Sequence, residues 1–140
     1  MATTTLQFVV ITPERVVFRA PVDSVSLMTE MGEITILPHH MPVVGIVKAG
    51  EVRIREGASE HHVATAAGYV QVRGGNEVIL LADAAERADE IDVVRAEAAR
   101  ARAHELITKR QFANDIEFAA LQAALERSLV RIRVARRRRA

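Results

Sequence analysis

The chain of 140 residues contains no cysteine and no tryptophan, and its aromatic residues are limited to one tyrosine and four phenylalanines. The absence of cysteine excludes disulfide bonds, thiolate nucleophiles and thiolate metal sites. No apolar run approaches the roughly 18–20 residues that a membrane-spanning helix needs. The first residues carry no basic segment and no arginine-rich amphipathic stretch, so we predict neither a secretory signal nor an organelle-targeting leader.

Residue types and motifs suited to catalysis are also scarce. The five histidines form two adjacent pairs and a single residue, namely His39, His40, His61, His62 and His104. Adjacent residues on a strand point to opposite faces, so neither pair is expected to chelate a metal ion by itself. The sequence has no H-x-x-x-H, no G-x-S-x-G and no P-loop motif. This composition disfavours a hydrolytic or metal-dependent enzyme and favours a protein that binds partners.

Glycine and proline are missing from the second part of the chain, since none of the seven glycines or four prolines lies beyond Gly75. Charge changes at the same place. Residues 1–87 carry seven basic and ten acidic residues, whereas residues 88–140 carry twelve basic and eight acidic ones. We therefore predict two modules, residues 1–86 and residues 87–140.

The first module is predicted to be an antiparallel β-sandwich. Short β-branched segments are separated by turn residues and show no helical period between them. Strict alternation in residues 51–56 and 69–73 predicts one face toward a core and one toward solvent. Gly74-Gly75-Asn76 is a tight-turn signal between the last two strands. The nine predicted strands are residues 6–11, 15–20, 22–29, 33–37, 43–48, 51–56, 61–67, 69–73 and 77–82.

The second module is predicted to be an antiparallel hairpin of two helices. Asp89 is the expected N-cap of the first helix, with acidic residues in its first turn. Asn114 and Glu117 form a capping-box pattern at the start of the second. The connection is expected around residues 111–113.

Apolar residues of the second helix recur at steps of three and four and predict one buried stripe. The facing helix offers mostly alanines, whose methyl groups stabilise far less than leucine side chains, at about 0.8 kcal/mol per buried carbon. Such a hairpin either moves between two positions or stays permanently docked, and composition does not choose between them. The stripe consists of Phe118, Leu121, Leu125, Leu129 and Ile132.

Two segments are candidate binding sites. Residues 38–42, Pro-His-His-Met-Pro, predict a rigid exposed turn, which is either a recognition loop or an ordinary turn. In residues 91–96, IDVVRA, Asp92 and Arg95 share a helix face with Arg102 seven residues beyond Arg95. Arg127 forms an i, i+4 pair with Arg131 on the facing helix, and these guanidiniums could hold nucleotide phosphates. The alternative is a solvated Asp92–Arg95 surface pair.

The chain ends in a strongly basic run. Six arginines lie within nine residues, a pattern that attracts nucleic acid, anionic lipid or an acidic protein surface. No aromatic residue that could stack on bases lies nearby, so we predict that nucleic acid is not the partner. The six residues are Arg131, Arg133, Arg136, Arg137, Arg138 and Arg139.

The whole chain resembles the epsilon subunit family of the F-type rotary ATP synthase. Residues 32–54, GEITILPHHMPVVGIVKAGEVRI, are similar to the most distinctive stretch of that family. TPERVVF (12–18) and AAGYVQVRGGNEVILLAD (66–83) also match in character. IDVVRA resembles an ATP-binding motif of some bacterial members. The resemblance implies the same fold, a sandwich followed by a two-helix arm.

The resemblance also implies a role. Such subunits are non-catalytic parts of the rotor that bind the gamma subunit and the ring of c subunits and couple the proton-driven ring to ATP synthesis. Their helices extend toward the alpha/beta catalytic head and oppose ATP hydrolysis. The implied location is the cytoplasmic side of a bacterial cell membrane, peripheral and held only through the complex. The implied rotor contacts are Glu33, His39, His40, Met41 and Pro42.

No cofactor is required in this interpretation, and ATP is an optional regulatory ligand. The residues that fall where some members hold ATP are Glu86, Ile91, Asp92, Arg95, Ala96, Arg102, Arg127 and Arg131. A different function remains open, that of a free cytosolic ATP-sensing protein in which the sandwich is only a scaffold for the helical hairpin.

Overall fold

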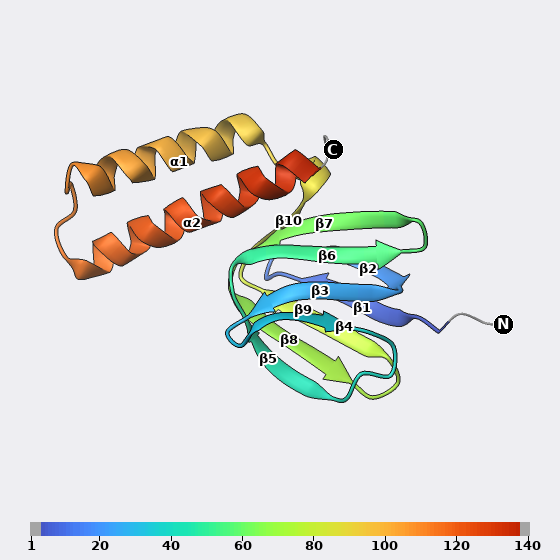
Figure 1. Cartoon of the computed structure of the whole chain (residues 1–140). Helices are drawn as coiled ribbons and strands as arrows, with labels where there is room; N and C mark the ends of the chain where they lie inside the picture. The colour runs from blue at the N-terminus through green and yellow to red at the C-terminus, as the bar shows by residue number, and fades with distance from the viewer. Residues whose placement is uncertain (1–3, 138–140) are drawn as a thin grey trace. The chain divides into compact units, whose positions relative to one another are not determined.

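The computed structural model describes residues 4–137, which divide into two compact units, a sandwich unit up to Arg87 and a helical hairpin from Ala88 onward (Figure 1). This fold class agrees with the sequence prediction of a β-sandwich followed by two helices. The strands are β1 (Leu6–Ile11), β2 (Val16–Val22), β3 (Ser24–Thr29), β4 (Gly32–Ile36), β5 (Val43–Val47), β6 (Gly50–Glu56), β7 (Ser59–Thr65), β8 (Gly68–Arg73), β9 (Glu77–Ala82) and β10 (Ala85–Arg87). The helices are the single 3₁₀ turn η1 (Ala88–Glu90), α1 (Val93–Thr108) and α2 (Asp115–Arg137).

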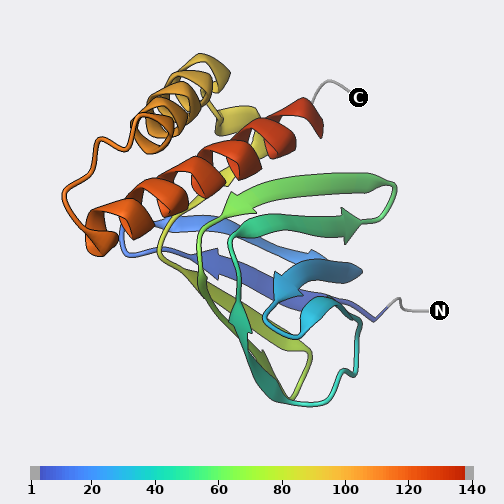
Figure 2. The same cartoon turned by 60° about the vertical axis from the view of Figure 1, so that its left-hand side comes forward.

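The strands form one continuous sheet that folds over into two layers (Figures 1 and 2). The order is β10-β7-β6-β3-β5-β8-β9-β1-β2, and β4 pairs with β3 outside this path. One pair of residues, Thr29 and Val47, joins β3 to β5 and marks the corner between the layers. One layer therefore holds β4, β3, β6, β7 and β10, and the other holds β5, β8, β9, β1 and β2.

Two features of the sheet differ from the sequence prediction. β1 runs parallel to β9, although every other pairing in the described sheet is antiparallel. β10 pairs with β7 but was not predicted, because Ala-Glu-Arg has neither β-branched residues nor alternation. Direction and partner of a strand depend on contacts distant in sequence, which local patterns do not encode.

The core of the sandwich unit lies between the two layers. Its largest fully buried side chains include Phe8, Leu27, Ile54 and Leu80. All members of the main apolar cluster come from the ten strands. The Gly74–Asn76 turn joins β8 to β9 as predicted, with Gly75 and Asn76 at φ 79° and 61°, in the left-handed region that such a turn needs.

In the helical hairpin, α1 and α2 lie antiparallel and pack on each other. The N-cap of α1 is Asp92, not the predicted Asp89, because η1 occupies residues 88–90. Asp92 has an extended backbone, and its Oδ1 accepts a hydrogen bond from the Arg95 backbone N–H at 3.1 Å. The predicted cap of α2 is present, since Asn114 Oδ1 accepts from the Glu117 N–H at 2.9 Å.

The predicted stripe of α2 is only partly buried. Ile132 is buried, but Leu129 is 41% exposed. The other buried residues of α2 include Val130 and Val134, which lie off the predicted stripe. The small side chains of α1, of which only Ala96 and Ala103 are buried, do not cover the longer side chains of α2. Neither helix within residues 4–137 is both long and apolar enough to cross a membrane.

Candidate functional site

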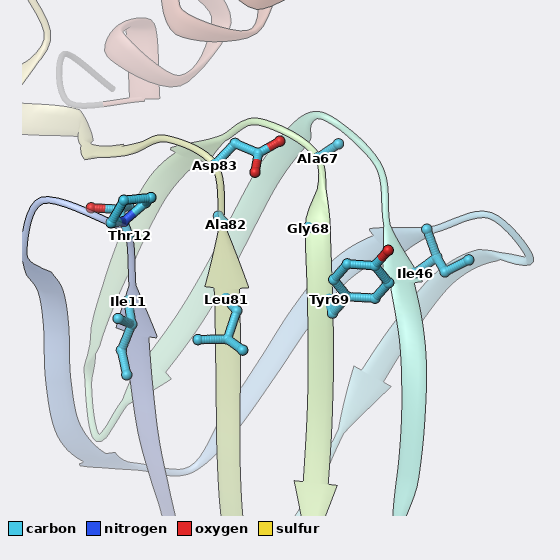
Figure 3. A pocket seen from close by; sticks show the side chains of 10 residues that line it. Ile11, Thr12, Ile46, Ala67, Gly68, Tyr69, Leu81, Ala82 and Asp83 are labelled. Atoms are coloured by element: carbon cyan, nitrogen blue, oxygen red, sulfur yellow. The ribbon is translucent and has the colours of Figure 1, made fainter.

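The outward side of the layer β5-β8-β9-β1 carries a row of apolar side chains. The pairing places Ile46 opposite Tyr69, Tyr69 opposite Leu81, and Leu81 opposite Ile11. Figure 3 shows these four side chains side by side on neighbouring strands. Tyr69 is 58% exposed, Leu81 49% and Ile46 48%. Successive side chains of a strand point to opposite faces of the sheet. The residues next to these four in sequence point toward the core, so the four themselves face outward.

A second row lies next to the first and extends the same surface. Val44 is opposite Gln71, Gln71 opposite Ile79, and Ile79 opposite Val9. We call the combined surface the apolar face, and it consists of Val9, Ile11, Val44, Ile46, Tyr69, Ile79 and Leu81. A hollow of about 460 Å³ opens at one end of it, also lined by Thr12, Pro13 and Asp83 (Figure 3). Contiguous exposed apolar surfaces of this kind mark binding sites for other molecules.

The loop between β4 and β5 contains four of the five predicted rotor contacts. His39, His40, Met41 and Pro42 are exposed, with Met41 at 77%. The backbone N–H of His39 donates to Asn76 Oδ1 at 2.6 Å, which ties this loop to the β8–β9 turn. His39 has a left-handed backbone at φ 67°, and the His40 N–H donates to the Leu37 carbonyl at 3.1 Å. The loop is therefore a fixed exposed turn that leads directly into β5 and the apolar face.

Glu33, the fifth predicted contact, lies in a different place. It is near the start of β4, at the opposite end of that strand from the loop, and forms an ion pair with Arg53 of β6. Its cross-strand partner on β3 is the exposed Met28, but the next row on that layer is polar. The row Thr35, Ser26, Arg53 and His62 crosses β4, β3, β6 and β7. The two outer faces of the sandwich thus differ in chemistry, one mainly apolar and one mainly polar.

The adjacent histidines of β7 point to opposite faces, as alternation predicts. His61 lies on the inner face of the sheet near its edge, 37% exposed, where its ring is 5.6 Å from that of Phe18 and its Nε2 is 2.9 Å from Glu56 Oε2. His62 lies on the other face of β7 with only 16% of its side chain exposed, between Glu51 and Glu60, each 3.6 Å away. No group of histidine and acidic residues within residues 4–137 has the arrangement of a metal site.

The residues predicted for nucleotide binding are distributed over both units. Glu86 lies in β10 of the sandwich unit. Ile91 is buried between η1 and α1, and Ala96 is buried in α1. The carboxylate of Asp92 is used as the cap of α1. The carboxylate accepts a hydrogen bond from the backbone N–H of Arg95 and not from its guanidinium. Asp92 and Arg95 are therefore joined by this cap and not by the predicted side-chain ion pair.

The predicted guanidiniums lie along the two helices. Arg95 and Arg102 are exposed on α1, Arg127 is exposed on α2, and Arg131 is half-buried there. The arginines of the basic run that belong to α2 are Arg131, Arg133, Arg136 and Arg137. Arg138 and Arg139 lie outside the described residues. The hairpin therefore carries its positive charge on both helices.

The apolar face was not identified from the sequence. Its signal is present in β9, where EVILLA is apolar on both faces, a pattern typical of strands covered on two sides. Tyr69 also stands at an outward position of the alternating strand YVQVR, where a polar residue would be expected. Neither signal alone separates an exposed binding surface from a buried strand, because the register of the sheet decides which positions align.

Two family descriptions match the chain in succession. The ATP synthase delta/epsilon chain beta-sandwich domain matches residues 5–88, and the corresponding long alpha-helix domain matches residues 89–136. Curated relatives named ATP synthase epsilon chain are similar over most of their length. The one from Syntrophobacter fumaroxidans is 42% identical over 126 residues, 90% of this chain and 92% of its own. That from Herpetosiphon aurantiacus is 40% identical over 134 residues, 96% of both chains.

Solved structures share the fold at lower identity. A chain of the Euglena gracilis mitochondrial ATP synthase OSCP/F1/c-ring assembly superposes with a TM-score of 0.74 at 19% identity, covering 88% of this chain and 76% of that one. A chain of the Tetrahymena thermophila mitochondrial ATP synthase central stalk and c-ring superposes with a TM-score of 0.62 at 12% identity, covering 93% and 96%.

Proposed function

The chain belongs to the family of ATP synthase epsilon chains, non-catalytic subunits of that complex, and we propose that it binds the rotor through the apolar face. The exposed row Ile46, Tyr69 and Leu81 is the observation that carries this proposal. An apolar surface rimmed by polar residues gains most by association with another protein, because its burial removes apolar area from water. The gamma subunit of the central stalk is the proposed partner on this face.

The loop at residues 37–42 is proposed to meet the ring of c subunits. It is exposed, it is held by the His39–Asn76 hydrogen bond, and it continues into β5, which carries part of the apolar face. A fixed loop loses little conformational entropy when it binds. Glu33 would then contact the rotor at a separate point, at the other end of β4. If the apolar face binds the gamma subunit and the loop binds the c-ring on the same rotor, the chain couples the ring to ATP synthesis.

The helical hairpin is proposed to oppose ATP hydrolysis by reaching the catalytic head. Its helices bury few large side chains against each other, and its α2 carries four described arginines that an acidic surface would attract. In this proposal, ATP is an optional regulatory ligand held by the eight residues predicted from the sequence. Peripheral location at the cytoplasmic side of a bacterial cell membrane would follow from the complex.

The rotor proposal is tested by pull-down of the purified gamma subunit with the full chain. Ile46→Asp combined with Tyr69→Asp is expected to abolish capture, because two carboxylates would have to be buried in an apolar contact. Thr35→Asp, also an outward strand position but on the polar layer, is the matched control and is expected to retain capture. Equal capture by all three proteins, with circular dichroism showing them folded, would refute the assignment of the apolar face.

A further inference from the structure

A second hollow, of about 280 Å³, lies between the two helices of the hairpin. Three of its lining residues are arginines, Arg100 on α1 and Arg133 and Arg136 on α2. Glu97 of α1 completes the charged lining, and Leu129 and Ile132 form its apolar wall. Within residues 4–137, none of these four charged side chains has an ion pair or hydrogen bond. The lining therefore carries a net charge of +2 that nothing in the described chain neutralises.

This hollow lies on the opposite flank of the hairpin from the predicted nucleotide residues. In a helix each residue is turned by about 100° from the one before it. Arg95 precedes the buried Ala96 by one residue, whereas Glu97 follows it by one, so they lie on opposite sides of Ala96. Arg102 likewise precedes the buried Ala103 by one residue, so it lies on the same side of α1 as Arg95.

The same separation holds on α2. Leu129, Ile132, Arg133 and Arg136 follow the i, i+3, i+4, i+7 pattern of a single helix face. Arg127 and Arg131 precede Leu129 and Arg133 by two residues, which turns them by about 200° from those positions. The two sets of arginines thus form separate basic surfaces, and the second set lines the hollow.

We propose that this hollow is a binding site for a small phosphate anion. The guanidinium group presents paired N–H donors that match phosphate oxygens, and three arginines line the hollow from two helices. At about 280 Å³ the hollow is at the lower end of the roughly 300–1,000 Å³ typical of sites for drug-sized ligands, a size that suits an inorganic anion or a terminal phosphate. Leu129 and Ile132 form an apolar wall on one side, next to which charge-assisted hydrogen bonds are stronger than in bulk water.

The experiment is calorimetric titration of the full chain with pyrophosphate, in low-salt buffer free of phosphate and sulfate. Wild type is expected to bind saturably, and affinity should fall as salt is raised. Arg100→Gln with Arg133→Gln should weaken binding at least about tenfold, the loss expected for a charge-assisted hydrogen bond. Glu97→Gln should tighten binding, because it removes the one negative charge from the lining.

Arg110→Gln is the matched control, because Arg110 is an exposed arginine of the same hairpin that belongs neither to the lining of the hollow nor to the predicted nucleotide residues, and it should leave pyrophosphate affinity unchanged. Repeating the titration with ATP present separates the two sources of the ligand: displacement assigns the site to a nucleotide's terminal phosphates, and lack of displacement to free inorganic anions. Absence of saturable binding by wild type, unchanged affinity in the double variant, or an equal loss in Arg110→Gln would each overturn the proposal. All four substitutions are at exposed surface positions, so folding is expected to be unaffected.

Discussion

Asp92 has two candidate roles that single substitutions can separate. Its carboxylate caps α1 by accepting the Arg95 N–H, and the resemblance to epsilon subunits also places it at an ATP site. Asp92→Ala removes both, and loss of an N-cap costs about 1 kcal/mol of helix stability. Asp92→Asn keeps the cap, because asparagine is an equally good N-cap, but it removes the charge.

We expect Asp92→Ala to lower the helicity and hydrogen-exchange protection of the first turn of α1, and Asp92→Asn to leave them unchanged. Arg95→Ala should also leave the cap intact, because only its backbone takes part. If the ATP role is correct, all three variants weaken ATP binding in calorimetry by roughly tenfold or more. ATP affinity that falls only in Asp92→Ala would mean that the residue acts through the cap alone.

Gly68 is the glycine whose replacement the sandwich tolerates least. A Cβ at this position would lie 2.0 Å from the Leu81 carbonyl oxygen and 2.8 Å from the Ala82 Cα, both backbone atoms of the adjacent strand β9. Gly68→Ala must therefore push β8 and β9 apart, at a cost of at least about 1–3 kcal/mol. Gly74→Ala is the control, since no atom lies within 4 Å of its Cβ position. Urea denaturation of both variants measures the difference, and equal stability would contradict the close approach of β8 to β9.

The sandwich and the helical hairpin are separate at the level of elements. Every member of the main apolar cluster comes from the strands, and β10 ends the last pairing of the sheet at Arg87. We expect a fragment of residues 1–87 to fold and to bind the gamma subunit. Chemical denaturation and pull-down test this expectation. Failure to fold would mean that the hairpin completes the sandwich, whereas a folded fragment that fails to bind would place the rotor contact elsewhere.

Strand segments and the order of modules were predictable because alternation, β-branched residues and the distribution of glycine and proline are local signals. β6 and β9 appear within one residue of their predicted bounds. The parallel pairing of β1 with β9 was not predictable, since it joins residues far apart in sequence. The start of α1 was missed because Asp89 and Asp92 are equally good caps, and the 3₁₀ turn decides between them. The apolar face was missed because it exists only once four strands are in register.

At the scale of the whole molecule, the two units carry opposite net charge. Residues 1–87 have three more acidic than basic residues, and residues 88–140 have four more basic than acidic ones. Opposite charges about 4 Å apart attract by about 4 kcal/mol at an effective dielectric of about 20, before desolvation is subtracted. Each arginine of the basic run that meets an acidic group of a partner would gain attraction of this size. The run as a whole would therefore decide between hairpin positions that differ by a few kcal/mol.

We expect deletion of residues 88–140 to raise ATP hydrolysis by the assembled complex and to leave its assembly intact. Neutralising the six arginines of the basic run with glutamine should give part of that increase, most clearly at low ionic strength, because salt screens the attraction. Steady-state hydrolysis across a salt series compares the three complexes. Equal rates throughout would leave the hairpin without a regulatory role.

The parallel pairing of β1 with β9 bears on how the protein is made. Gln7 lies opposite Glu77, so one edge of β1 stays open until β9 has been synthesised. At about 5–20 residues per second, the intervening chain takes roughly 4–14 s to appear. During that time β1, with the uncharged sequence LQFVVI, presents an apolar strand edge of the kind that templates aggregation. Nascent chains that stop before residue 77 should therefore aggregate on release, whereas chains that reach residue 87 close the sheet and stay dispersed.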